Sequence, residues 1–176
     1  MTCSVYEKFM RAIVANDCAT VMKHWSSQHV TDSDRQWGFK EAVHFNQHVM
    51  VQYMLDNCLD AESLLVNEYG NCLKWLATKN TPSQLIEFDA LTHLLISYTD
   101  RLNEQHQYET FELFVACQHR RGAAQMTDVV GPTKIYEWLQ ANPTWNKLLP
   151  EVMQNITLQH SVGEVSWLPQ PSTRKI

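Results

Sequence analysis

The side chains of this sequence best suited to chemistry are a few histidines, a cysteine and neighbouring arginines. Glu41, His44 and His48 are spaced like ligands along a helix, and carboxylate and imidazole groups bind zinc. A turn at Asn46 would separate the two histidines, and no third strong ligand follows nearby. We therefore predict no metal site.

A second reactive group lies near the end of a later predicted helix. Cys117 and His119 have the types of a nucleophile and its base, but residues two apart on a helix do not face each other. His119, Arg120 and Arg121 would suit a phosphate or an acidic partner. They would also suit the negative end of a helix that Gly122 caps, and the sequence favours this structural interpretation over a binding role.

Motifs of the common enzyme classes are absent from the sequence. There is no P-loop, dinucleotide fingerprint, nucleophile elbow or His-Glu-x-x-His. We therefore expect no catalytic residues, no cofactor and no small-molecule substrate. One alternative stays open, a small all-α enzyme or enzyme regulator with a pocket formed by the C-terminal helices. Its candidate residues are His93, Cys117, His119, Arg120 and Tyr136.

Composition narrows the class of protein further. A length of 176 residues fits one domain, and a formal charge of −5 argues against a dedicated nucleic-acid binder. No long uncharged apolar run predicts a membrane span, and the first residues lack the features of a signal peptide. Five cysteines without a CxxC pair argue against a disulfide framework. We expect a cytoplasmic protein without nucleic-acid or membrane partners.

The apolar residues indicate helices rather than strands. Five glycines are few for a sheet with tight turns, and apolar positions recur at helical spacing. Phe39, Ala42 and Val43 would line one helical face before Asn46, a residue that accepts the left-handed conformation. The same spacing follows at Val51, Met54 and Leu55. The sequence therefore predicts an all-α fold that contains a helical hairpin over 36–58.

This pattern recurs on both sides of the hairpin. Its upstream members are Phe9, Ala12, Ile13, Asn16 and Val21, and its downstream members are Leu73, Leu76, Ala77, Asn80 and Leu85. Asn16 precedes Asn46 by 30 residues, and Asn80 follows it by 34. These intervals lie on either side of a period of about 33 residues, typical of one class of helical repeat.

The stretch resembles a divergent ankyrin repeat. An ankyrin repeat opens with Thr-Pro-Leu-His, continues with a small pair and a Gly turn, and ends with a second helix. Here Phe39 stands for the Leu, Ala42 and Val43 for the small pair, Asn46 for the Gly, and 50–55 for the second helix. Trp-Gly-Phe-Lys replaces the opening motif. The resemblance, which covers about residues 5–88, implies stacked hairpins at 5–30, 36–58 and 70–90.

Further helices are expected to complete a single domain over 1–160. Thr81 would cap a helix with Pro82 at its first position and Gln84 closing a capping box. The remaining helices are expected over 90–102, 109–121, 133–142 and 144–154, where the last two would cover the end of the stack. A flexible tail is expected over 161–176.

The leading functional interpretation is a non-enzymatic module that binds a protein partner. The resemblance places the contacts on loop tips and on outward positions of each first helix. These positions are Arg35, Gln36, His44, Phe45, Tyr69, Gly70, Thr78 and Lys79. A scaffold that keeps the turns but loses the consensus would also suit a microbial or viral protein that acts on host proteins, in the host cytosol.

Overall fold

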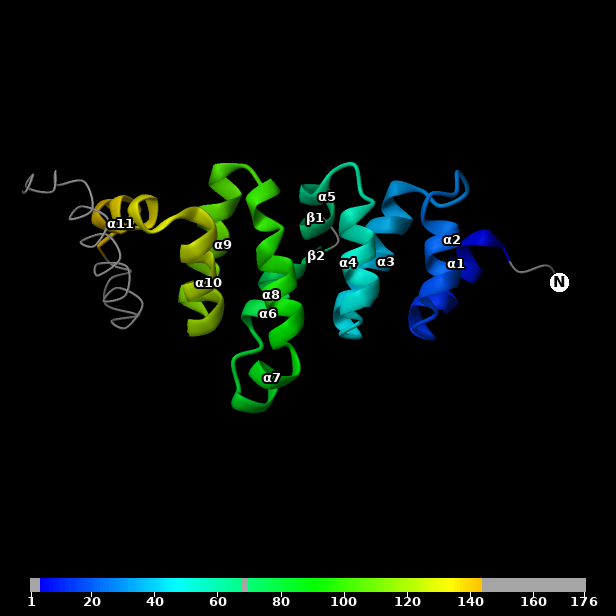
Figure 1. Cartoon of the computed structure of the whole chain (residues 1–176), viewed down its shortest axis with the longest axis horizontal. Helices are drawn as coiled ribbons and strands as arrows, with labels where there is room; N and C mark the ends of the chain where they lie inside the picture. Colours follow the sequence, from blue (N-terminus) through cyan, green and yellow to red (C-terminus); the bar gives the residue numbers. More distant parts are fainter. Residues whose placement is uncertain (1–3, 68–69, 144–176) are drawn as a thin grey trace, which may run out of the picture.

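Helices form nearly all of the regular structure in the computed structural model, which describes residues 4–67 and 70–143. In this part the exception is a short antiparallel pairing of Val66–Asn67 (β1) with Gly70–Asn71 (β2). Figure 1 shows an elongated molecule, with helices side by side in a row that follows the chain. The predicted all-α class is confirmed. Among the described helices, none has the length and apolar character needed to cross a membrane.

The row begins with α1 (Val5–Val14) and α2 (Cys18–Trp25), where the sequence predicts the first hairpin. Ser4 begins α1 through a capping box with Glu7, so two otherwise unpaired backbone amides are satisfied. Asp17 begins α2, because its side chain accepts a hydrogen bond from a backbone amide of the first turn.

The second hairpin consists of α3 (Asp32–His44) and α4 (His48–Asp56). Thr31 caps α3 in a capping box with Asp34, so the helix starts four residues before the predicted position at Gln36. The predicted start was wrong because this reciprocal pair of hydrogen bonds fixes the helix end earlier in the polar segment.

Three turns between helices share one geometry. Asn16, Asn46 and Gln118 have φ of 55°, 55° and 57°, so the positive φ predicted for Asn46 is confirmed. The amide of the next residue then donates to a carbonyl five residues back, which is the Schellman arrangement. These bonds run from Asp17 to Ala12 (2.8 Å), from Gln47 to Ala42 (2.9 Å) and from His119 to Phe114 (2.8 Å). Each turn lets the second helix begin two residues after the left-handed residue.

The turn at Gln118 joins α9 (Glu104–Ala116) to α10 (Arg120–Val130). The predicted helix over 109–121, closed by Gly122, was therefore wrong. Gly122 lies inside α10 with its backbone against the Phe114 ring, where any Cβ would come within 2.3 Å of that ring.

The middle of the row departs from the simple hairpin pattern. After α4 come α5 (Ala61–Leu65), the two short strands, α6 (Cys72–Ala77), α7 (Pro82–Glu87), α8 (Asp89–Ser97) and the 3-10 turn η1 (Thr99–Arg101). α7 buries none of its residues, and α8 supplies Leu91 and Leu95 to the core. The third predicted hairpin, over 70–90, therefore contains an exposed helix where a core helix was expected.

The turn predicted at Asn80 does lie between two helices, α6 and α7, but Asn80 is not among the described residues with positive φ, so this turn lacks the geometry of the other three. The next helix still begins two residues later, at Pro82. In the three Schellman turns the residue before the new helix has ψ between 67° and 82°, whereas Thr81 has ψ of 151°. A residue before proline is held to such an extended ψ by the proline ring. Pro82 therefore excludes the regular turn.

Thr81 and Pro82 do occupy the predicted cap and first helical positions. The predicted capping box with Gln84 was wrong, because the Thr81 hydroxyl donates to the Gln84 side-chain oxygen at 2.8 Å and makes no cap bond to the backbone.

The helices pack in two layers. α1 contacts α3 and α6 contacts α9, which places the first helix of each pair in one layer. α2, α4, α8 and α10 contact one another in order and form the second layer. The core lies between these layers and includes Phe9, Phe39, Leu73 and Phe114, which are fully buried.

Side-chain amides link neighbouring hairpins along the edge of the row where the turns lie. Gln47 donates to the Ile13 carbonyl at 2.6 Å, and Asn46 donates to the Glu87 carbonyl at 2.8 Å. Asn80 donates to the Cys117 carbonyl at 2.8 Å. Residues that the sequence marks as turns therefore also hold adjacent hairpins together.

The described part ends with α11 (Pro132–Ala141), which lies across the end of the row (Figure 1). It begins one residue before the predicted helix over 133–142. The helix predicted over 144–154 and the tail over 161–176 lie outside the described residues.

Candidate partner-binding surface

The predicted contact residues fall in separate places along α3 and α6. Arg35 lies in the first turn of α3 and His44 in its last, which at 1.5 Å per residue are more than 10 Å apart along the axis. Phe45 follows α3, and Thr78 and Lys79 follow α6. The structure therefore separates Arg35 and Gln36 from the other positions.

Arg35 is engaged within the molecule. Its Nε donates to the Trp25 carbonyl at 2.8 Å and its Nη2 to the Ser27 carbonyl at 3.1 Å. Its Nη1 pairs with Asp32 at 2.7 Å. Two of its five N–H groups thus hold the end of α2 and the loop that follows it, and a third bonds to Asp32 in the first turn of α3, so the main role of Arg35 is structural.

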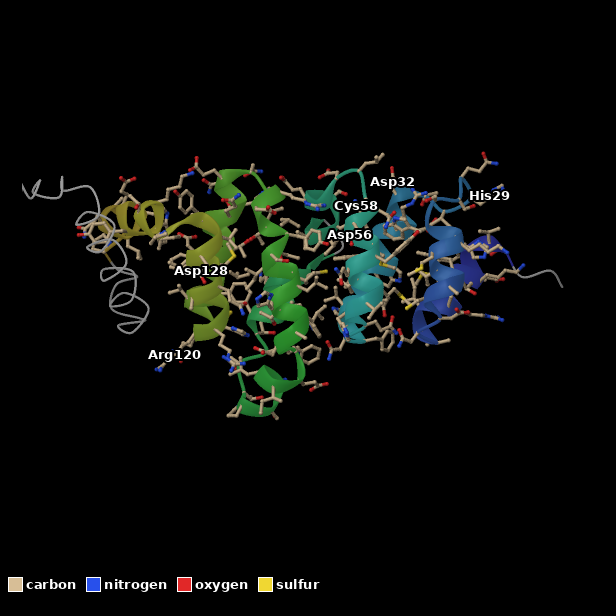
Figure 2. The ribbon with its side chains drawn as sticks, in the orientation of Figure 1. His29, Asp32, Asp56, Cys58, Arg120 and Asp128 are labelled. Atoms are coloured by element: carbon tan, nitrogen blue, oxygen red, sulfur yellow. The ribbon has the colours of Figure 1, made fainter. Side chains whose placement is uncertain are left out.

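Arg35 and Gln36 also line a hollow of about 520 Å³ between two loops. One loop joins α2 to α3, and the other joins α4 to α5. In Figure 2, Asp32 and Cys58 mark these neighbouring loops along the upper edge of the row, opposite the edge where the turns lie. The Cys58 thiol donates to the Leu55 carbonyl, and burial raises its pKa, so it is a poor nucleophile.

His44 and Lys79 meet in an aromatic cluster between α3 and α6. The His44 and Trp75 rings lie 4.6 Å apart, and Trp75 meets Phe88 edge to face at 5.2 Å. The Lys79 ammonium lies over the Trp75 ring, 4.4 Å from its centre. Aromatic pairs and cation–π contacts of this kind stabilise a defined arrangement. Here three segments of the chain form the His44–Trp75–Phe88–Lys79 cluster, in which Phe88 is buried and the other three residues are partly exposed.

Exposed aromatic side chains accompany this cluster on and after α3. Phe45 is 50% exposed and Trp37 is 39% exposed. The Lys40 ammonium lies over the Trp37 ring, 4.8 Å from its centre. Thr78, beside Lys79, donates its hydroxyl to the Trp75 carbonyl at 2.6 Å. α3 and α6 therefore present aromatic groups, each with a lysine above it.

The charge of His44 follows from its surroundings. Burial lowers the pKa of His44, and the ammonium groups of Lys40 and Lys79 act in the same direction, whereas Glu41 opposes them. The imidazole is therefore neutral near pH 7, and the two lysines supply the positive charge.

The remaining predicted contact residues are Tyr69 and Gly70. Gly70 begins β2 and pairs with Asn67. Tyr69 lies outside the described residues, so its predicted role stays a prediction.

Among the residues of the enzyme alternative, His119 has a structural role. His119 is buried, and its Nδ1 accepts the Gly122 amide at 3.0 Å as the cap of α10. His93 is exposed on α8, and Tyr136 is partly buried on α11. Neither the hollow at Arg35 nor the groove between α1 and α2 described below is lined by His93, Cys117, His119, Arg120 or Tyr136. Within 4–67 and 70–143, no three His, Cys, Asp or Glu side chains are grouped to hold a metal ion.

Trp75, Phe88 and Lys40 were missed by the sequence-based selection. Trp75 precedes Lys79 by four residues, a spacing at which helical side chains meet, and this signal was available. Phe88 had no such signal, because it reaches Trp75 only through the fold.

Comparisons with known proteins give no relationship. No family model, curated protein or solved structure matches the chain. Any functional assignment therefore depends on the geometry of this molecule.

Proposed function

We propose that this chain is a non-enzymatic interaction protein that binds a protein partner through α3, α6 and the turns that follow them. The observation that carries the proposal is the His44–Trp75–Phe88–Lys79 cluster, together with exposed Phe45. Tryptophan, tyrosine and arginine are over-represented among residues that dominate binding energy, and aromatic side chains in general are enriched at interfaces.

The partner is expected to bring an apolar side chain and a carboxylate. Phe45 is half exposed and would pack against the apolar group, while Lys79, held in place by Trp75, would meet the carboxylate. Because the rings are already positioned by their mutual contacts, little side-chain freedom would be lost on binding.

We further propose that the hairpins are divergent ankyrin-like repeats. Asn16 and Asn46 have the same φ, the same hydrogen bonds and a separation of 30 residues, all of which support this assignment. His44, Phe45, Thr78 and Lys79 then occupy positions at which such repeats contact partners. The proposal includes action of a microbial or viral protein on a host protein in the host cytosol.

Affinity capture with matched variants tests the interaction. The immobilised full chain is exposed to a cell lysate in parallel with Phe45→Ala and Lys79→Gln, and captured proteins are identified by mass spectrometry. Lys74→Gln is the control, since Lys74 is exposed on α6, the helix that ends before Lys79, and its substitution removes the same charge as Lys79→Gln. We expect one partner that is lost from the two cluster variants and retained by the control. Equal capture by all four proteins would refute this surface.

A further inference from the structure

A shallow groove of about 530 Å³ lies between α1 and α2 at the beginning of the row. Lys8 and Arg11 line it from α1, and Lys23 and His24 line it from the end of α2. Because the two helices are antiparallel neighbours, the beginning of α1 lies beside the end of α2. Cationic side chains from two segments therefore gather around one concave surface, which we term the α1–α2 groove.

The lysines and the arginine of this groove lack acidic partners. Within the described residues, no carboxylate forms an ion pair with Lys8, Arg11 or Lys23. Elsewhere in the described part Arg35, Arg121 and Lys134 are each paired with a carboxylate. In a chain of formal charge −5, three cations without a carboxylate partner therefore lie at one groove and concentrate positive charge there.

The acidic residue of the groove is already engaged. The Asp17 carboxylate accepts the Thr20 amide at 3.1 Å, and the hydrogen bonds from Thr20 lower its pKa. It caps α2 and remains charged, so it occupies the helix N-terminus that would otherwise attract an anion. An anionic ligand must therefore bind through the side chains of Lys8, Arg11 and Lys23.

The groove faces away from the neighbouring hairpin. Phe9 and Ile13 pack against Gly38 of α3. The approach is so close that a Cβ added at Gly38 would come within 2.7 Å of the Ile13 side chain. At about 100° per residue, Lys8, Arg11 and Ala15 lie on the side of α1 roughly opposite to Ile13. The groove thus stays accessible when the hairpins are packed. Its floor contains Ala12 and Ala15, whose small side chains allow a polypeptide backbone to approach closely.

We infer that the α1–α2 groove binds an acidic polypeptide segment. The cations are distributed over one turn of α1 and the end of α2, an arrangement that suits carboxylates spaced along a chain. A compact phosphate is expected in a more enclosed site with converging donors, whereas this groove is shallow and open. The site is separate from the His44–Trp75–Phe88–Lys79 cluster and does not depend on it.

Fluorescence anisotropy with a labelled hexaglutamate peptide and the full chain tests this site. At low ionic strength we expect saturable binding, weakened about threefold by Arg11→Gln or Lys23→Gln and about tenfold by the double variant, as for exposed ion pairs. The control is again Lys74→Gln, an equal change of charge on α6, which should leave binding unchanged. Hexaglutamine of the same length should not bind.

Five results would overturn the inference. Hexaglutamate that fails to bind, or binds equally to the double variant, removes the site. If Lys74→Gln weakens binding as much as the groove variants do, binding depends on the net charge of the protein and not on the groove. Tighter binding of inorganic tripolyphosphate, or capture by phosphatidylserine vesicles without peptide binding, assigns the groove to phosphate groups. Phe45→Ala should bind hexaglutamate normally, so this outcome is independent of the proposed function.

Discussion

The turns at Asn46 and Asn80 follow the same arrangement of apolar residues, yet the chain folds differently at the two positions. At Asn46 the backbone is left-handed and a core helix follows at once. At Asn80 it is not, and the helix that follows buries none of its residues. The difference arises two residues after each asparagine, since Asn46 is followed by His48 at that position and Asn80 by Pro82. An apolar pattern therefore predicts the first helix of a hairpin, while the residues after the turn decide whether a regular hairpin forms.

The largest expected effect compares valine at these two asparagines. Asn46→Val should lower the free energy of unfolding by about 2–3 kcal/mol, because a β-branched residue is disfavoured at positive φ and the bond to the Glu87 carbonyl is lost. Asn80→Val should cost only about 1 kcal/mol, the value of its bond to Cys117. Urea unfolding monitored by circular dichroism measures both.

Glycine at position 46 provides the control for that comparison. Asn46→Gly keeps positive φ accessible and loses only the side-chain bond, so it should be clearly more stable than Asn46→Val. The reverse order would mean that Asn46 lies within a continuous helix, and the hairpin assignment would then fail.

A smaller effect is expected at the third regular turn. Gln118 has φ of 57°, a conformation that glycine adopts without steric cost. Gln118→Gly should therefore stabilise the chain by about 0.5–1 kcal/mol. A rise in melting temperature supports the shared geometry, whereas a fall would show that the Gln118 side chain contributes more than its backbone conformation costs.

The smallest expected effect concerns the caps that follow two of these turns. Burial lowers the pKa of His119, so near and below pH 6.5 the unfolded chain binds more protons than the folded chain. Stability should therefore decrease as the pH falls from about 7.5 to about 5.5. His119→Asn keeps an acceptor for the Gly122 amide and should reduce this decrease in melting temperature by roughly 1–3 °C.

Asp17 makes the corresponding cap in the first hairpin and provides the contrast. The hydrogen bonds from Thr20 lower the pKa of Asp17. Its contribution to the stability of the fold is therefore lost only at more acidic pH, as the carboxylate becomes protonated. Asp17→Asn should leave the decrease between pH 7.5 and 5.5 unchanged. His44 is unchanged in both variants. Because its pKa is also lowered, it should still contribute part of the decrease in stability as the pH falls.

Local residue types predicted the all-α class and the turns at Asn16 and Asn46, because asparagine tolerates positive φ and lies at a fixed distance from apolar pairs. The turn at Gln118 was missed because glutamine carries no such signal. The sequence pattern at Asn80 matched that of the regular hairpins, but no such hairpin forms there. Pro82 was recognised as the first residue of a helix, yet its effect on the ψ of Thr81 was not considered.

The candidate surface was predictable only in part. His44, Phe45, Thr78 and Lys79 were selected because the resemblance to ankyrin repeats implies contacts at loop tips and at outward positions of each first helix. The contact of Trp75 with both His44 and Phe88 joins residues far apart in the chain, and no local pattern contains that information. Arg35 was selected as exposed, yet carbonyl groups of the preceding loop accept its hydrogen bonds.

The position of α7 has a practical consequence for work with this protein. α7 buries none of its residues, while Asn46 donates to the carbonyl of its last residue, Glu87, and Asn80, two residues before the helix, donates to the Cys117 carbonyl. Exposed segments with fixed ends tolerate added sequence well. An epitope or a fluorescent protein inserted after Ser83 should therefore leave the packing of the row intact and report its location in a cell without altering either terminus.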